Sequence, residues 1–201
     1  YIDYTRASTC LNPFLPDIFF QQIKEEYEGT RLERSEIYGE ILDDAPGAIF
    51  KQEWIDGARA YQVPPVLHKV VVAIDPSASA HEKSDLTGII VAGRAPDKRI
   101  YIIEDCSGIL KPDEWSDRAV TRYRQWEANA IIAERNNGGD MIEAVIRAQD
   151  PGCHVETVWA SRGKIIRAEP VAQLYTKGMV CHVGQHHKLE AEMTQWEPGN
   201  P

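Results

Sequence analysis

The clearest pattern in the chain is a series of short apolar runs after residue 63, several of them closed by a polar residue. The first three runs are joined by short connections, which is typical of an antiparallel meander. The later runs alternate with segments that have apolar residues at helical spacing. The pattern predicts strands at residues 69–75, 86–93, 99–106, 130–134, 154–158 and 179–183, and helices at residues 112–127, 140–149, 162–177 and from 189 onward.

This order of elements predicts an α/β fold with a mixed sheet, made of an antiparallel three-strand meander plus parallel strands and flanked by helices. Pro170 predicts a kink or a restart within the helix at 162–177. The residues before this region have a helical and acidic pattern, with helices expected at 13–29, 30–42 and 51–60. Val63-Pro64-Pro65 reads as a stiff boundary, so we expect a helical linker segment at 1–62 and a second domain at 63–201.

Charge and composition restrict how this chain could bind nucleic acid, and they argue against disulfides and membrane-spanning segments. The net charge is −9, and residues 1–60 hold twelve acids against six bases, whereas residues 61–201 hold nineteen against sixteen. An acidic chain binds phosphate only through a local basic patch or a bound metal ion. The four cysteines form no CxxC pair and predict free thiols. No apolar run reaches eighteen residues, so we expect no membrane-spanning segment.

Two predicted strands each end in a carboxylate, Asp75 after VVVAI and Glu134 after AIIA. If these strands are neighbours, both acids project from one edge of the sheet, and Asp85 can reach the same rim from the hairpin loop. Carboxylates held close together repel unless a cation lies between them, and Mg²⁺ or Mn²⁺ is the natural occupant. A pair of such ions about 4 Å apart can hydrolyse a phosphodiester. The alternative is that each acid is a turn former or a helix cap.

The chain contains the strings AERNNGG and SRGKxxRAxP. These and several other strings resemble the nuclease domain of phage large terminase subunits, and these two are the most specific parts of the resemblance. The resemblance covers nearly the whole chain, in segments 27–50, 70–93, 131–146, 159–184 and 189–201.

The resemblance implies an RNase H-like fold and a metal-dependent endonuclease that cuts concatemeric viral DNA during genome packaging. It implies that Asp75 and Glu134 are catalytic, metal-binding acids and that Asp85 is an additional acid of the two-metal site. The family has a further late Asp, expected beyond Pro201, so the domain is expected to be C-terminally incomplete. The implied partners are double-stranded viral DNA, the motor ATPase domain of the same full-length protein, the small terminase subunit and the portal, in the host cell cytoplasm.

Other functions stay open at the level of sequence. They are another RNase H-like nuclease of the resolvase or transposase type, a non-catalytic module that docks DNA or the portal, and an actin-like nucleotide-binding half domain. The chain has no GxxxxGK[ST] loop, so we expect no ATP hydrolysis by this chain itself. The actin-like hypothesis needs a glycine-rich loop after Asp75, and the sequence there is Ser77-Ala78-Ser79-Ala80.

Four basic residues are candidate contacts for DNA phosphates: Lys83 in the predicted hairpin, and Arg162, Lys164 and Arg167 in the SRGKxxRAxP stretch. A solvated helix face is the alternative for the last three. The tryptophans at 115, 126, 159 and 196 are expected in the core rather than on a base-stacking surface.

Overall fold

The computed structural model describes residues 9, 14–16, 18–19, 21, 37–38, 44–45, 47–76, 86–134, 139–159 and 163–197. The chain divides into two compact units. One unit is Trp54–Gly184, and the other combines Tyr1–Glu53 with Gln185–Pro201. The expected boundary at residue 62 stays a prediction. In the described part of the chain, no helix has the length and apolar character that a membrane crossing requires.

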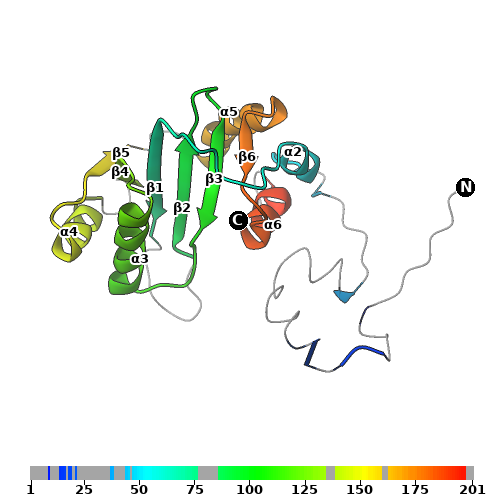
Figure 1. Ribbon diagram of the computed structural model, residues 1–201, viewed down its shortest axis with the longest axis horizontal. Coiled ribbons are helices and arrows are strands. Elements are labelled where there is room, and N and C mark those ends of the chain that lie inside the picture. The colour runs from blue at the N-terminus through cyan, green and yellow to red at the C-terminus, as the bar shows by residue number, and fades with distance from the viewer. Residues whose placement is uncertain are drawn as a thin grey trace, which may run out of the picture. The chain divides into compact units, whose positions relative to one another are not determined.

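The larger unit is built on one sheet, which has six strands within the described residues (Figure 1). Their order across the sheet is β5-β4-β1-β2-β3-β6. The strands are β1 (Lys69–Asp75), β2 (Gly88–Arg94), β3 (Ile100–Asp105), β4 (Ala130–Glu134), β5 (Val155–Val158) and β6 (Val180–His182). Each of them overlaps a strand predicted from the sequence.

Strand directions match the expected mixed sheet. The first three strands pair antiparallel in the order of the chain, which confirms the meander. Strand β4 lies parallel to β1, β5 lies parallel to β4, and β6 lies parallel to β3. Because β1 and β4 are direct neighbours, the two strands that end in acids lie side by side.

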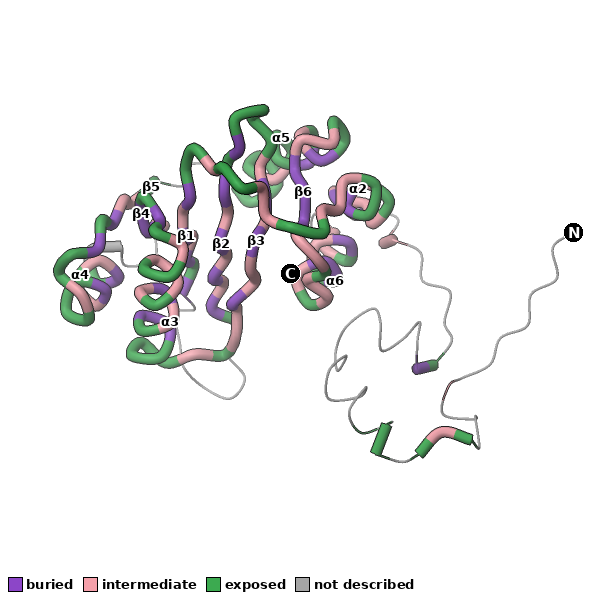
Figure 2. Tube along the Cα trace, in the orientation of Figure 1, coloured by how far each residue is buried: buried purple, intermediate pink, exposed green. Residues whose placement is uncertain are grey.

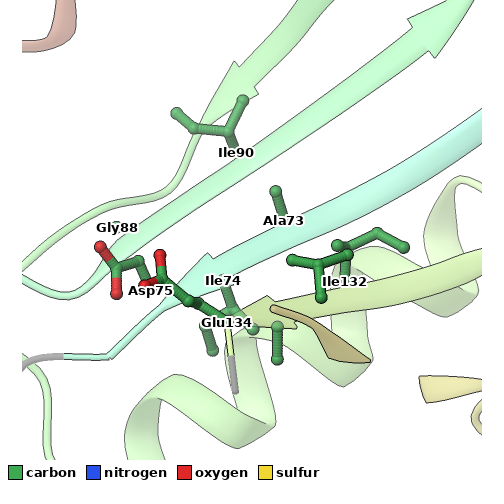
Figure 3. A pocket seen from close by; sticks show the side chains of 9 residues that line it. Ala73, Ile74, Asp75, Gly88, Ile90, Ile132 and Glu134 are labelled. Atoms are coloured by element: carbon green, nitrogen blue, oxygen red, sulfur yellow. The ribbon is translucent and has the colours of Figure 1, made fainter. Parts of the chain in front are cut away.

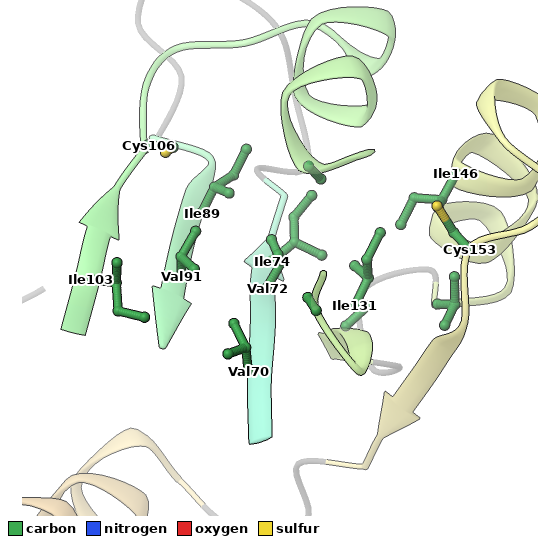
Figure 4. Close-up of a cluster of buried hydrophobic side chains, with 14 of the residues drawn as sticks. Val70, Val72, Ile74, Ile89, Val91, Ile103, Cys106, Ile131, Ile146 and Cys153 are labelled. Carbon is green, nitrogen blue, oxygen red and sulfur yellow. The ribbon is translucent and has the colours of Figure 1, made fainter. Parts of the chain in front are cut away.

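One face of the sheet carries the core. In β1 the buried positions alternate, with Val70, Val72 and Ile74 turned to one side, as the period of two in a strand requires. They form a cluster with buried residues of the neighbouring strands and of two helices (Figure 4). The helices are α3 (Pro112–Gln125), which contributes Trp115 and Ala119, and α4 (Gly139–Gln149). The burial of the sheet and the outward exposure of the helices are seen along the trace in Figure 2.

Helix α3 begins where its sequence predicts. Pro112 occupies the first turn, where a missing backbone N–H costs nothing. The side chain of Glu114 accepts a hydrogen bond of 2.8 Å from the backbone N–H of Lys111, so a donor that the helix itself leaves open is satisfied. Asp113 adds a second acid to the positive end of the helix dipole.

Helix α5 (Lys164–Thr176) contacts strand β6 at the edge of the sheet. It runs through Pro170 as one helix, so a restart at this residue is wrong and the alternative, a kink, stays a prediction. It ends in a Schellman motif, in which the N–H of Gly178 donates to the carbonyl of Tyr175 and the N–H of Met179 donates to that of Leu174. Gly178 adopts a φ of 63°, a conformation that favours glycine.

The second unit is described mainly by α6 (His187–Gln195) and residues 44–53. The buried carboxylate of Glu190 accepts hydrogen bonds from the backbone N–H of His186 and from the side chain of Gln52. Gln52 begins the short helix α2 (Gln52–Gly57), within the predicted range. The helices predicted at 13–29 and 30–42 fall mostly outside the described residues.

Candidate active site

Asp75 and Glu134 terminate adjacent parallel strands. The register pairs Ala73 with Ile132 and Ile74 with Ala133, and each acid is the next residue of its strand. Side chains two positions apart share a face, so Asp75 lies on the face of Ala73 and Glu134 on that of Ile132. Neighbouring strands are about 4.8 Å apart, which brings the two carboxylates next to each other. Figure 3 shows them together at the strand ends.

Asp75 and Glu134 line an open pocket on the face of the sheet opposite to helices α3 and α4. Among the described residues, four strands line it: β1 with Ala73, Ile74 and Asp75, β2 with Gly88 and Ile90, β4 with Ile132, Ala133 and Glu134, and β5 with Val158. Its volume of about 220 Å³ has room for an ion with several waters. Gly88 pairs directly with Asp75 in the register, so the strand beside this acid presents no side chain.

The electrostatics of the pair are those of two acids that share a site. Asp75 is exposed to solvent at the rim of the pocket, yet partial desolvation of its carboxyl group raises its pKa above the ordinary 3.8. The negative charge of Glu134 raises this pKa further. Lys164 and Arg167 oppose both effects and lower it. The ionised pair therefore carries a repulsion that nearby positive charge relieves.

Two of the predicted basic residues lie beside these acids. Lys164 and Arg167 belong to the first turn of α5, where the N–H of Arg167 donates to the carbonyl of Gly163. Arg167 Nη1 donates a hydrogen bond of 2.8 Å to Glu134 Oε2. The acids and these bases thus converge from β1, β4 and α5, which are far apart in the sequence.

Three predicted site residues, Lys83, Asp85 and Arg162, lie outside the described residues, and their roles stay predictions. Among the residues that are described, no group of three or more His, Cys, Asp or Glu side chains is placed to hold a metal ion. Among the described residues, the groups of this pocket that could bind a metal ion are therefore two carboxylates. Two carboxylates with water suit Mg²⁺, which typically keeps several of its waters.

The chain matches a known protein family over the region that holds this pocket. The family described as "Terminase RNaseH-like domain" matches residues 72–196, which include both acids and the strands that carry them. The chain belongs to this family. The predicted resemblance to large terminase nuclease domains is confirmed, and so is the RNase H-like fold.

Solved structures share the fold of this terminase RNaseH-like domain at low sequence identity. The nuclease domain of the large terminase subunit gp2 of bacterial virus Sf6 has a TM-score of 0.53 and 16% identity, with 74% of this chain and 81% of that chain covered. The human cytomegalovirus terminase nuclease domain has a TM-score of 0.52 and 14% identity, with 67% and 76% covered.

The large terminase from a thermophilic bacteriophage has a TM-score of 0.51 and 14% identity, with 88% of this chain covered. This terminase RNaseH-like domain spans 44% of that longer chain. No curated protein sequence matches the chain.

Some features of the terminase RNaseH-like site cannot be read from the sequence. Gly88 and Val158 line the pocket, and only strand pairing identifies them, through Asp75 and Glu134 respectively. The expectation that the tryptophans at 115, 126, 159 and 196 lie in the core is wrong for Trp159, which is 69% exposed directly after Val158. Trp115 is buried as expected.

Proposed function

We propose that this domain is a divalent-metal-dependent DNA endonuclease that cuts concatemeric viral DNA during genome packaging. The observation that supports it most is the meeting of Asp75 and Glu134 on one face of the sheet, at the ends of adjacent parallel strands. A turn-forming or capping role for the two acids does not require them to share a pocket. Membership of the terminase family favours this function over a resolvase or a transposase.

Asp75 and Glu134 would hold the ions, with Asp85 as an additional ligand. Bound Mg²⁺ or Mn²⁺ supplies an activated water and neutralises charge at a phosphodiester. Manganese is named for a relative, since the human cytomegalovirus nuclease domain is described as Mn soaked. The protein's own contribution is to fix two carboxylates on rigid strands, so that little reorganisation is needed when a cation arrives.

The basic residues have a separate role in this proposal. Lys164 and Arg167 bring positive charge to the rim of an otherwise acidic site, together with the predicted Lys83 and Arg162. Contacts of this type position the DNA backbone and carry no sequence information. We therefore expect cleavage with little sequence preference. Other subunits of the packaging machine would regulate where the DNA is cut.

The partners follow from the same proposal. They are double-stranded viral DNA, a motor ATPase domain in the same polypeptide, the small terminase subunit and the portal. The large terminase of the thermophilic bacteriophage is also described in complex with ATP-gamma-S, and this domain covers about half of its length, 52%. ATP hydrolysis would thus belong to a part of the parent protein other than this chain.

Plasmid cleavage in Mg²⁺ or Mn²⁺ tests the function. We expect Asp75→Asn and Glu134→Gln to reduce cleavage by at least about a hundredfold, because each removes a charged ligand. Asp97→Asn is the matched control, since Asp97 lies in the turn between β2 and β3 at the other end of the sheet. The assay includes a form extended beyond residue 201 that carries the expected late acid. Equal cleavage by all three variants would refute the proposal.

A further inference from the structure

Arg167 does more than add positive charge near the site, because it forms a direct hydrogen bond with Glu134. The guanidinium donates to Glu134 Oε2 at 2.8 Å, with the Arg167 side chain 41% exposed and that of Glu134 18% exposed. A side chain that tracks DNA phosphates does not need a contact with an acid of the proposed metal site. Arg167 instead lies on one of the two carboxylates that a cation would need.

Lys164 gives a useful comparison. It belongs to the same helical turn, and its charge, like that of Arg167, stabilises the ionised form of Asp75. Only Arg167 combines this charge with a hydrogen bond to Glu134 among the contacts of the described residues. A comparison of variants at Lys164 and Arg167 therefore distinguishes the effect of nearby positive charge from the effect of the hydrogen bond to Glu134.

The chemistry of the guanidinium allows it to exchange partners. Its planar set of donors matches a carboxylate and a phosphate equally well, which a lysine ammonium does not do. An ion pair with this degree of exposure is weak, so a divalent cation can displace it. The displaced guanidinium would then lie beside the bound ion, where a phosphate is expected.

We propose that Arg167 occupies Glu134 in the metal-free domain and competes with the metal ion for this carboxylate, so that binding of the ion releases the guanidinium toward the DNA phosphate. This inference rests on the proposed function, in which Glu134 is a metal ligand. By linkage, an ion that frees a phosphate-binding group raises the affinity for DNA, and DNA raises the affinity for the ion. Arg167 is thus a positioning residue that couples the two ligands.

Calorimetric titration with Mn²⁺ alone tests the competition without any cleavage step. We expect Arg167→Gln to bind Mn²⁺ roughly three- to fivefold more tightly than Lys164→Gln, because only the first variant removes a partner of Glu134. Both variants lose one positive charge near the site, so the comparison cancels the general effect. Equal affinities of the two variants, or weaker binding by Arg167→Gln, would overturn the inference.

Glu134→Gln distinguishes this outcome from failure of the proposed site. If Glu134→Gln binds Mn²⁺ as tightly as the unmodified chain, Glu134 is not a ligand and the proposed function fails at this residue. If Glu134→Gln weakens binding while Arg167→Gln and Lys164→Gln behave alike, the site stands and the competition is refuted. Thermal unfolding of each variant without metal verifies that it is folded.

Discussion

The hydroxyl group of Tyr175 on α5 lies 2.8 Å from Nε2 of His182 on β6, and both side chains are buried. The two rings meet edge to face, with centroids 5.7 Å apart. This pair joins the C-terminal part of α5 to the edge strand of the sheet. The same helix carries Lys164 and Arg167 at its other end, so the position of these cations depends on how well α5 is held.

We expect Tyr175→Phe to lower the free energy of unfolding by about 1–2 kcal/mol, because it removes a buried hydrogen bond while keeping the ring. Tyr123→Phe is the matched control. The Tyr123 hydroxyl accepts an exposed hydrogen bond of 3.3 Å from the backbone of His154, and we expect a loss below about 0.5 kcal/mol. Urea unfolding measures both. Equal losses would mean that the hydroxyl of Tyr175 does not anchor the helix.

Asp75→Asn is expected to stabilise the metal-free domain at neutral pH. Partial desolvation and the charge of Glu134 raise the pKa of Asp75, so the folded domain holds this proton to a higher pH than the unfolded chain does. The associated stability is present below the ordinary pKa of 3.8 and is lost as the pH rises through the raised value. At pH 7 the ionised group therefore costs stability, and the asparagine does not.

The expected gain is small because Asp75 is solvent-exposed, about 1–3 °C in melting temperature at pH 7. It should shrink toward pH 4, and saturating Mn²⁺ should reverse the order by stabilising only the protein that has both acids. Thermal melts at the two pH values, with and without the ion, measure this. A lower melting temperature for the metal-free asparagine variant at pH 7 would contradict the prediction.

Gly88 is expected to keep the proposed metal pocket open. A Cβ atom at this position would meet the Cβ atom of Asp75 at 3.8 Å, which is an ordinary contact, so Gly88→Ala should bind Mn²⁺ within about twofold of the unmodified chain. Gly88→Val adds two methyl groups beside the carboxylate, and we expect about tenfold weaker binding. Calorimetry compares the two variants. Tight binding by the valine variant would show that Asp75 reaches the ion from another side.

Gly178 is required by the end of α5. Its φ of 63° is strained for any residue with a Cβ atom, although no atom beyond its two chain neighbours lies within 4 Å of the position that this Cβ would take. We expect Gly178→Ala to cost about 1 kcal/mol through the backbone alone. Gly57→Ala, at the end of α2, has equally open surroundings without the positive φ and should be neutral or slightly stabilising. Denaturant midpoints of the two variants give the comparison.

The sheet and its helices were largely predictable because each strand is a distinct apolar run between turn signals. The proximity of Asp75 and Glu134 followed from a general rule about strand ends, once the two strands were assumed to be neighbours. The register that aligns the acids could not be predicted, because nearly every residue of both runs is apolar and several alignments would bury them equally well.

Contacts between side chains that are distant in the chain could not be predicted from the sequence. Arg167 is 33 residues after Glu134, and nothing in the string SRGKxxRAxP indicates which partner its guanidinium would choose. Trp159 was assigned to the core on its residue type alone. It follows the last residue of β5, which is the outermost strand on its side of the sheet among the described residues. Residue type could not give the position of β5 at the sheet edge.

The parallel pairing of β1 with β4 has a consequence for the order in which the protein folds. The meander of β1, β2 and β3 pairs strands that follow one another, whereas Asp75 and Glu134 are separated by 59 positions in the chain. Pairings between distant segments form slowly because a long loop must close first. A nascent or partly folded chain can thus hold the complete meander and still lack the acidic pair. We expect the capacity to cut DNA to be acquired only after the meander has formed.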